Sequence, residues 1–489
     1  MLAKFNSQIS QGKFFSKEYV FSTVLSLEIA FLIFRCIRPV GGLDAFRQAQ
    51  TVWPVKVWNK DGFSPFQPSV PIKGVMHESW LLEVPIYQWI VYIVNLIFRV
   101  DPVYISRLIS LACALYCVHF LATRISRKLN VNFSLVVVLM ISNPYMFYWM
   151  STGLVDWLAL AFGVIAGQLA ISNKGKEWLS LGVCFAILGS GVKPSHSLFG
   201  FLLVACFRHA EIKRSQLLMR AGAIAGLMFL TSSLWQKWVS ELYPLGDPRS
   251  IWSLNSSTYS WYFGSLDQYV HFAKNYVFVM ERLIPSFGGA ILVAACLFGF
   301  LATDFNWKTK LSLIVLPSAY IIGLINLNVS HYYYQIPMAL VLSTIMCTGF
   351  IYWSRQELIW KFRREFLFVT AAALLISFTI TGANMSYIKS VLVDEPARTE
   401  CLEKAETEKS SVLLVNLENP AFFYECNLKS FQVNLIKGTD AKAFEAEKNM
   451  YKFVYVEDNF TEVSDYISSL NGSVEKVNGK QHWYKIIWD

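Results

Sequence analysis

A succession of long apolar segments fills the first 385 residues of this chain and limits what it can fold into. Of its 489 residues, 54% are hydrophobic and only 16% are charged, and the mean hydropathy is +0.40. Soluble domains rarely have this composition, whereas chains that cross a bilayer several times do, because a spanning helix needs about 20 mostly apolar residues. The sequence therefore predicts a polytopic α-helical membrane protein.

Eleven segments have the apolar content of transmembrane helices. The first is long enough to span and lacks a small-residue cleavage site, so it is interpreted as a span and not as a cleaved leader. The fifth and sixth are short, and the turn between them holds the sequence GVKPS at 191–195. The predicted helices cover roughly 19–37, 104–123, 131–149, 157–172, 177–191, 195–208, 218–240, 286–303, 309–327, 333–352 and 365–384.

One apolar segment, 84–100, decides the predicted topology. It is shorter than the usual span of about 20 residues and has Pro85 near its start. If it lies at the interface, every short basic loop falls on the cytoplasmic side; if it spans, the later loops reverse and the bias is lost. The first arrangement is favoured, so 38–104 forms one large outer loop with amphipathic pieces on the membrane. The net charge of +9 then reflects cytoplasmic loops and not a nucleic-acid partner.

The composition changes after residue 385, where charged residues return. The segments SVLLVNL (411–417) and YKFVYVED (451–458) have the pattern of buried strands, while ENPAFFYE (418–425) and FTEVSDYISSL (460–470) have that of helices. The Asn-Gly pair within 474–488 is a strong hairpin signal. These features predict a transmembrane module at 1–385 and a small soluble α/β domain at 386–489, on the outer side.

The nine cysteines give little evidence of metal or redox chemistry. Seven fall within predicted spans, where cysteine packs as a small apolar residue. Cys401 and Cys426 fall in the predicted outer domain, where they could form a disulfide or remain free thiols. The sequence has no CxxC, no His/Cys metal spacing, no P-loop and no GxGxxG, which argues against an ATP-driven machine.

Polar residues gather at the outer membrane edge in the first large loop. Asp44, Arg47 and Gln48 follow the first span, and Glu83 lies near the end of the loop. Asp44 could simply pair with Arg47 or Arg38, and Glu83 could be an ordinary interfacial acid. Alternatively, the carboxylates, the guanidinium and the amide could bind a polar head group beside the lipid.

A second group of polar residues lies near the outer ends of later spans. Arg107, a few residues into the second span, is costly in lipid unless it pairs with a carboxylate, such as Glu28, or with a lipid phosphate. Lys193, in the GVKPS turn, could reach toward the membrane surface or hold a phosphate.

The remaining candidates have equally ordinary alternatives. Asp156 could be a simple helix cap. His331 and Tyr333, in the sequence HYYY, could belong to an aromatic belt or hydrogen-bond to a sugar or phosphate.

Six short motifs follow one another in order along the chain: LDAFRQAQT, DGFSPFQP, ESWLLEVPIYQWIVYI, SRLIS, GVKPS and SHYYYQIP. In combination they resemble the membrane glycosyltransferases of the C-type fold, in the bacterial branch akin to protein O-mannosyltransferases and the lipid A aminoarabinose transferase. The resemblance covers about the first 385 residues.

This resemblance implies a polyprenyl-phosphate-linked sugar donor and an inverting transfer at the periplasmic face of the bacterial inner membrane, to a glycan, lipid or protein acceptor. It places the catalytic aspartate at Asp44, a second acid at Glu83 and the arginine of the second helix at Arg107. Many relatives have an acidic pair where this chain has Asp44-Ala45. Metal dependence varies across the fold, so a divalent metal is left open, with no other cofactor implied. The further substrate-binding candidates are Arg47, Gln48, Asp156, Lys193, His331 and Tyr333.

The chemistry of such a transfer fits the residues independently of the resemblance. A sugar on a lipid phosphate is already activated, so transfer needs a base for the acceptor hydroxyl and positive charge for the departing phosphate.

A membrane transporter would place its charges mid-span, often in matched halves. An O-antigen polymerase or ligase of lipid-linked glycans would carry its large outer loop late. The early loop and the polar outer edge favour the glycosyltransferase over both.

Overall fold

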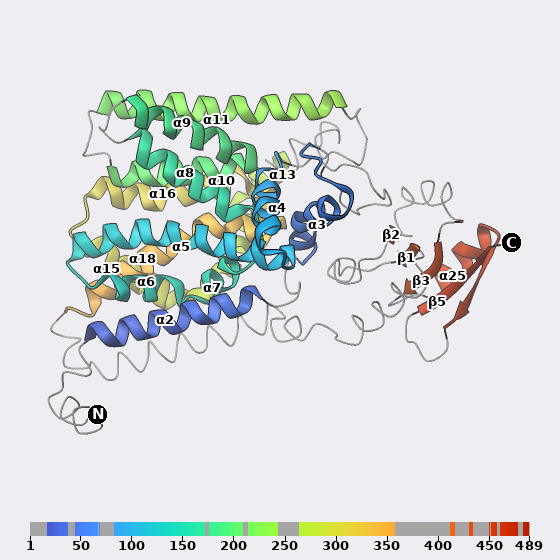
Figure 1. The fold of residues 1–489 in the computed structure, drawn as a ribbon. Coiled ribbons are helices and arrows are strands. Elements are labelled where there is room, and N and C mark those ends of the chain that lie inside the picture. Colours follow the sequence, from blue (N-terminus) through green and yellow to red (C-terminus); the bar gives the residue numbers. More distant parts are fainter. Residues whose placement is uncertain are drawn as a thin grey trace, which may run out of the picture. The chain divides into compact units, whose positions relative to one another are not determined.

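The computed structural model is mainly helical (Figure 1). The residues that it describes are 17–37, 45–66, 68, 83–171, 176–208, 214–242, 264–356, 411–415, 430–433, 449, 451–456, 460–477 and 483–488. Asp44, the predicted helices at 365–384 and 418–425, and both Cys401 and Cys426 lie outside them.

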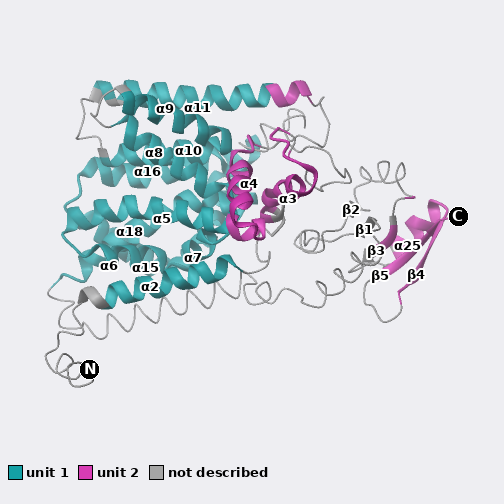
Figure 2. Ribbon diagram, viewed as in Figure 1, with its two compact units in different colours: residues 1–37, 106–237, 256–385 teal, residues 38–105, 238–255, 386–489 magenta. Residues whose placement is uncertain are grey.

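The chain divides into two compact units (Figure 2). One comprises 1–37, 106–237 and 256–385, and the other comprises 38–105, 238–255 and 386–489. The large loop after the first helix therefore groups apart from the helical bundle that follows it.

Helices make up the described part of the first unit. Each of the first ten predicted spans coincides with helical structure. The elements are α2 (Lys17–Cys36), α5 (Pro102–Leu129), α6 (Phe133–Ile141), α7 (Pro144–Met150), α8 (Asp156–Ala170), α9 (Lys176–Val192), α10 (Pro194–Arg208), α11 (Arg214–Leu242), α13 (Leu266–Val270), α14 (Phe272–Leu283), η3 (Ile284–Phe287), α15 (Gly289–Ala302), α16 (Trp307–Gly323), α17 (Ile325–Ser330), η4 (Tyr332–Gln335) and α18 (Ile336–Trp353).

The predicted spans are not all single straight helices. Within the described residues, three helices are long and apolar enough to cross a membrane, or up to five if each of two bent pairs is one span. The predicted span 131–149 is wrong as one helix, because α6 and α7 meet at 88°. The Asn143 side chain accepts hydrogen bonds from the backbone N–H groups of Tyr145 and Met146, and Pro144 opens α7. A new helix therefore starts inside the apolar run.

Helices α8, α9 and α10 form the tightest part of the bundle. A Cβ atom on Gly163 of α8 would lie 2.0 Å from the backbone oxygen of Ser197 in α10, and one on Gly200 would lie 2.4 Å from that of Leu160. Glycine at both positions lets the two backbones touch, which is how helices commonly associate where lipid removes the hydrophobic driving force. This contact fixes the first turn of α10 beside α8.

In the second unit, the described part of the large loop contains α3 (Ala45–Asp61) and α4 (Ile86–Phe98). Helix α4 corresponds to the segment predicted to lie at the interface. The helix has 13 residues. Tyr87 and Val91 are buried on one face, while Ile93 and Ile97 are exposed on the other. At 1.5 Å per residue the helix measures about 20 Å, shorter than the ~30 Å hydrocarbon core of a bilayer.

The described part of 386–489 contains a five-stranded sheet, with strand order β2-β1-β3-β5-β4. The strands predicted at 411–417 and 451–458, the helix at 460–470 and the hairpin within 474–488 are confirmed as β1, β3, α25 and the antiparallel pair β4–β5. Strands β2 and β3 both run parallel to β1, while β5 runs antiparallel to β3. The bounds are β1 (Ser411–Val415), β2 (Ser430–Val433), β3 (Tyr451–Val456), α25 (Phe460–Ser469), β4 (Gly472–Lys476) and β5 (Trp483–Trp488).

Candidate functional site

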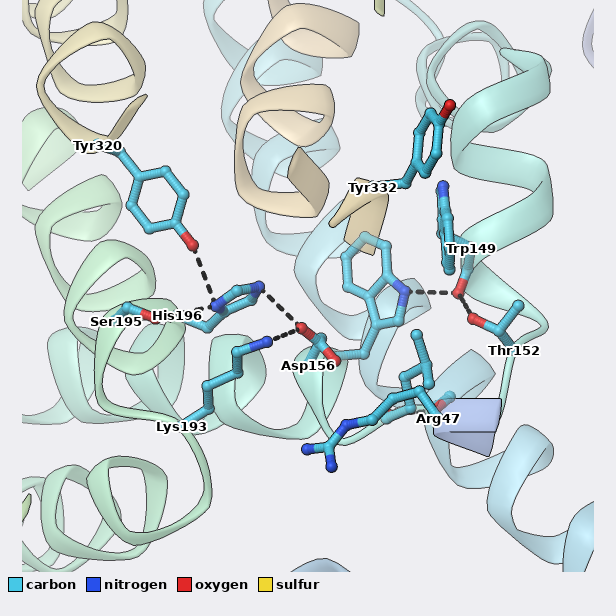
Figure 3. A network of polar contacts seen from close by, with 12 residues as sticks. Arg47, Trp149, Thr152, Asp156, Lys193, Ser195, His196, Tyr320 and Tyr332 are labelled. Carbon is cyan, nitrogen blue, oxygen red and sulfur yellow. Dashed lines mark hydrogen bonds and ion pairs between the residues drawn. The ribbon is translucent and has the colours of Figure 1, made fainter. Parts of the chain in front are cut away.

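A buried charged cluster lies where the N-terminal ends of α8 and α10 meet (Figure 3). Asp156 is the first residue of α8, Lys193 lies between α9 and α10, and His196 is in the first turn of α10. Pro194 opens α10, because its fixed φ suits the first helical position and its missing N–H is not needed there. The turn therefore brings Lys193 and His196 to the same carboxylate.

Lys193 and His196 both contact one oxygen of Asp156. The Lys193 Nζ atom lies 2.5 Å from Asp156 Oδ1, and the His196 Nε2 atom lies 3.0 Å from the same oxygen. The side chains of Asp156 and His196 are fully buried, whereas 9% of the Lys193 side chain is exposed. A buried carboxylate is tolerable only when it is paired, and the positive end of the α8 dipole further favours its negative charge.

Aromatic rings cover the Lys193 ammonium group. Its Nζ atom lies 3.5 Å from the ring centroid of Tyr334 and 4.6 Å from that of Tyr333, within the range of cation–π attraction. The ring of His331 stacks on Tyr333 with centroids 5.2 Å apart. The structure thus brings four of the predicted site residues together: Asp156, Lys193, His331 and Tyr333.

Three residues of this cluster, His196, Tyr320 and Tyr334, were not among the predicted ones. Tyr320 OH lies 3.2 Å from His196 Nδ1. His196 directly follows the GVKPS turn, so a histidine beside a charged turn was a usable signal. Tyr320 lies within the apolar helix α16, where nothing in the sequence distinguishes it from a packing residue.

Arg107 is buried in α5 and does not pair with Glu28, one of the two partners that the sequence suggested. The Arg107 Nη1 atom lies 3.5 Å from the backbone oxygen of Arg35. Glu28 Oε1 instead accepts a hydrogen bond from Ser142 Oγ, at 2.6 Å. Ser142 follows α6 at the bend toward α7, and its hydroxyl is the partner that Glu28 has instead.

A second polar cluster lies in the second unit and joins the two ends of the large loop. Arg47 Nη2 donates to both oxygens of Glu83, at 2.7 and 2.8 Å, and its Nη1 donates to Gln50 Oε1 at 2.8 Å. Gln48 is buried beside them in α3. The first turn of α3 is thereby tied to the segment that leads into α4.

The described residues offer no ready metal centre. Within those ranges, no group of three or more His, Cys, Asp or Glu side chains could hold a metal ion. The seven described cysteines are free thiols.

At the level of sequence, no family model and no curated protein matches this chain. Solved structures do. The crystal structure of ArnT from Cupriavidus metallidurans bound to undecaprenyl phosphate is similar over 96% of this chain and 98% of its own, with a TM-score of 0.59 and 11% identity. The apo structure of the same protein gives a TM-score of 0.57 at 10% identity, with the same coverage.

This chain has the C-type glycosyltransferase fold. The prediction from the motif order is therefore confirmed at the level of fold. A looser similarity links the C-type fold of this chain to the archaeal oligosaccharyltransferase AglB from Archaeoglobus fulgidus, with a TM-score of 0.44, 12% identity, and coverage of 90% of this chain and 69% of that one.

Proposed function

We propose that this chain transfers a sugar from a polyprenyl-phosphate-linked donor to an acceptor hydroxyl at the periplasmic face of the bacterial inner membrane, with inversion. The observation that carries the proposal is the similarity of the fold to ArnT over nearly the whole of both chains, one ArnT structure being bound to undecaprenyl phosphate. The ordered motifs at 43–51, 78–93 and 330–337 support it independently.

The donor phosphate needs cationic partners near the membrane surface. Lys193 is suited to this role because its ammonium group is held in place by Asp156 and two tyrosine rings while part of the side chain stays exposed. Arg107 is a second candidate, and Tyr333 and His331 would line the head group beside Lys193. These groups would stabilise the negative charge that builds on the phosphate as the sugar departs.

Asp44 is the proposed general base. It directly precedes α3 in the sequence. The other candidate, Glu83, has both carboxylate oxygens engaged by Arg47, which suits it to holding the loop. In the proposed step, the Asp44 carboxylate takes the hydroxyl proton as the acceptor oxygen bonds to the anomeric carbon, and the bond to the phosphate oxygen breaks. A single displacement of this kind inverts the anomeric centre.

The acceptor is a hydroxyl of a glycan, a lipid or a protein, and cell-surface chemistry can identify it. Surface glycans from cells with and without the gene should differ by one sugar when compared by mass spectrometry. Identical profiles under several growth conditions would contradict the proposed function.

The assignment of the base is tested by Asp44→Asn, with Glu83→Gln as the matched acid-to-amide control. General-base assistance is typically worth about 10²–10⁴ in rate. Asp44→Asn should therefore lose most turnover while undecaprenyl phosphate binding stays near the wild-type value. If Asp44→Asn keeps wild-type turnover and Glu83→Gln loses it, Glu83 is the base.

A further inference from the structure

His196 is fully buried, so it cannot act on a lipid head group directly. Its contacts lead instead to Lys193, 9% of whose side chain is exposed. The imidazole lies between Tyr320 and Ser195 on one side and Asp156 on the other. Asp156 in turn holds the Lys193 ammonium group.

The groups around the His196 imidazole indicate which of its two ring nitrogens carries the proton. Tyr320 OH lies 3.2 Å from Nδ1, and Ser195 Oγ lies 3.3 Å from the same nitrogen. The ionised Asp156 carboxylate can only accept, which places the ring proton on Nε2, the nitrogen 3.0 Å from Asp156 Oδ1. Both hydroxyl groups can then donate to Nδ1. A neutral histidine in this tautomer places its N–H beside the carboxylate without adding charge.

We propose that His196 is a positioning residue, which fixes the Asp156 carboxylate so that its Oδ1 atom holds the Lys193 ammonium group where the donor phosphate binds. The inference rests on the proposed function. A carboxylate with a single partner can rotate about its last side-chain bond, whereas contacts from two directions to one oxygen define its orientation (Figure 3). Ligand-holding side chains in proteins are commonly oriented by such outer partners.

Two amide substitutions separate the two sides of the imidazole. In His196→Gln, the amide nitrogen can occupy the place of Nε2 and keep the contact with Asp156. In His196→Asn, the shorter side chain places its amide near the position of Nδ1, so the contact with Tyr320 can remain while that with Asp156 is lost. Both variants are uncharged and polar, so each serves as the control of the other.

The first measurement is the dissociation constant of undecaprenyl phosphate for the full-length protein in nanodiscs. We expect His196→Gln to bind within about threefold of the wild type, while His196→Asn weakens binding at least tenfold, toward the value for Lys193→Ala. Equal binding by the Gln and Asn variants would overturn the inference. Absence of binding by the wild type would instead contradict the proposed function.

A second measurement tests the inference without any donor. His196→Asn, Asp156→Asn and the double variant are compared by thermal unfolding. If His196 acts through Asp156, the shift in Tm of the double variant should be clearly smaller than the two single shifts added together, because contacting residues are not additive. Additive shifts would show that His196 does not act through Asp156, whatever the outcome with the lipid.

Discussion

At the scale of single residues, Lys193 is a charge with close partners on several sides. Its ammonium group has a carboxylate on one side and two tyrosine rings on the other. Cation–π contacts are worth about 2 kcal/mol or more when desolvated, so the rings add to the ion pair and do not merely cover it. The group is thereby held as a point charge whose position hardly varies.

Removing this charge should have two separable effects. Lys193→Met leaves the buried Asp156 carboxylate without its cationic partner, so we expect a loss of about 3–5 kcal/mol in the free energy of unfolding, measured in detergent. Adding Asp156→Asn should recover part of that stability, because the unpaired charge is then gone. Undecaprenyl phosphate binding should stay weak in both variants. Recovered binding in the double variant would show that Lys193 has only a structural role.

The Arg47–Glu83 pair gives a second residue-scale prediction. Arg47→Lys keeps the charge but cannot make two parallel hydrogen bonds to the carboxylate. We expect turnover to fall about tenfold in Arg47→Lys, with donor binding little changed, because the pair orders the segment next to Asp44. Arg124→Lys, at a position outside both polar clusters, is the control and should retain full turnover.

The residues of the site were partly predictable. Asp156, Lys193 and Tyr333 stand out because charged or aromatic groups at the ends of apolar helices need a reason. Their partnership does not follow from the sequence, since Lys193 and Asp156 are 37 positions apart and meet only through the packing of α8 and α10. His196 was missed because a single histidine in an apolar helix is usually a packing residue, although its place beside the charged GVKPS turn was a usable signal.

At the scale of elements, hydropathy located helices well and their interruptions poorly. The apolar runs at 131–149 and 309–327 both predict one helix, yet each is two. High hydropathy over a segment indicates only that the segment is buried. A helix cap such as Asn143-Pro144 changes the chain direction without lowering the hydropathy of the segment. Strands β1 and β3 and the β4–β5 hairpin were easier to predict, because short apolar runs between polar segments have few alternatives, whereas β2 was not predicted.

The close packing of α8 and α10 predicts unequal effects of two identical substitutions. A Cβ at Gly163 would meet a backbone oxygen at 2.0 Å, whereas one at Gly222 in α11 would meet nothing within 4 Å. Gly163→Ala should therefore destabilise the protein by about 1–3 kcal/mol through overpacking. Gly222→Ala should be neutral or stabilising by up to about 1 kcal/mol, because alanine favours the helix. Thermal unfolding of the two variants in the same detergent measures the difference; equal stabilities would contradict this packing.

At the scale of the whole molecule, the predicted topology states on which side of the membrane each loop and the C-terminus lie. A reporter fused after Asp489 should respond as outside the inner membrane, and one inserted near Lys128 should respond as inside. The physical reason is the clustering of Lys and Arg in loops on one side. A C-terminal reporter on the inside would mean that the segment containing α4 spans, and the proposed periplasmic site would be wrong.

The short central helices have a consequence for the bilayer itself. Helices α8 and α10 contain 15 residues each, or about 22 Å of length at 1.5 Å per residue. A hydrocarbon core of ~30 Å exceeds this by about 8 Å, and local thinning of the membrane is one way in which such a mismatch can be met. Thinning on the side of Asp156 and Lys193 would draw head groups and water down to them. A lipid-linked sugar would then reach the buried charges without leaving its leaflet, and its polyprenyl chain would stay in the hydrocarbon core of the bilayer throughout.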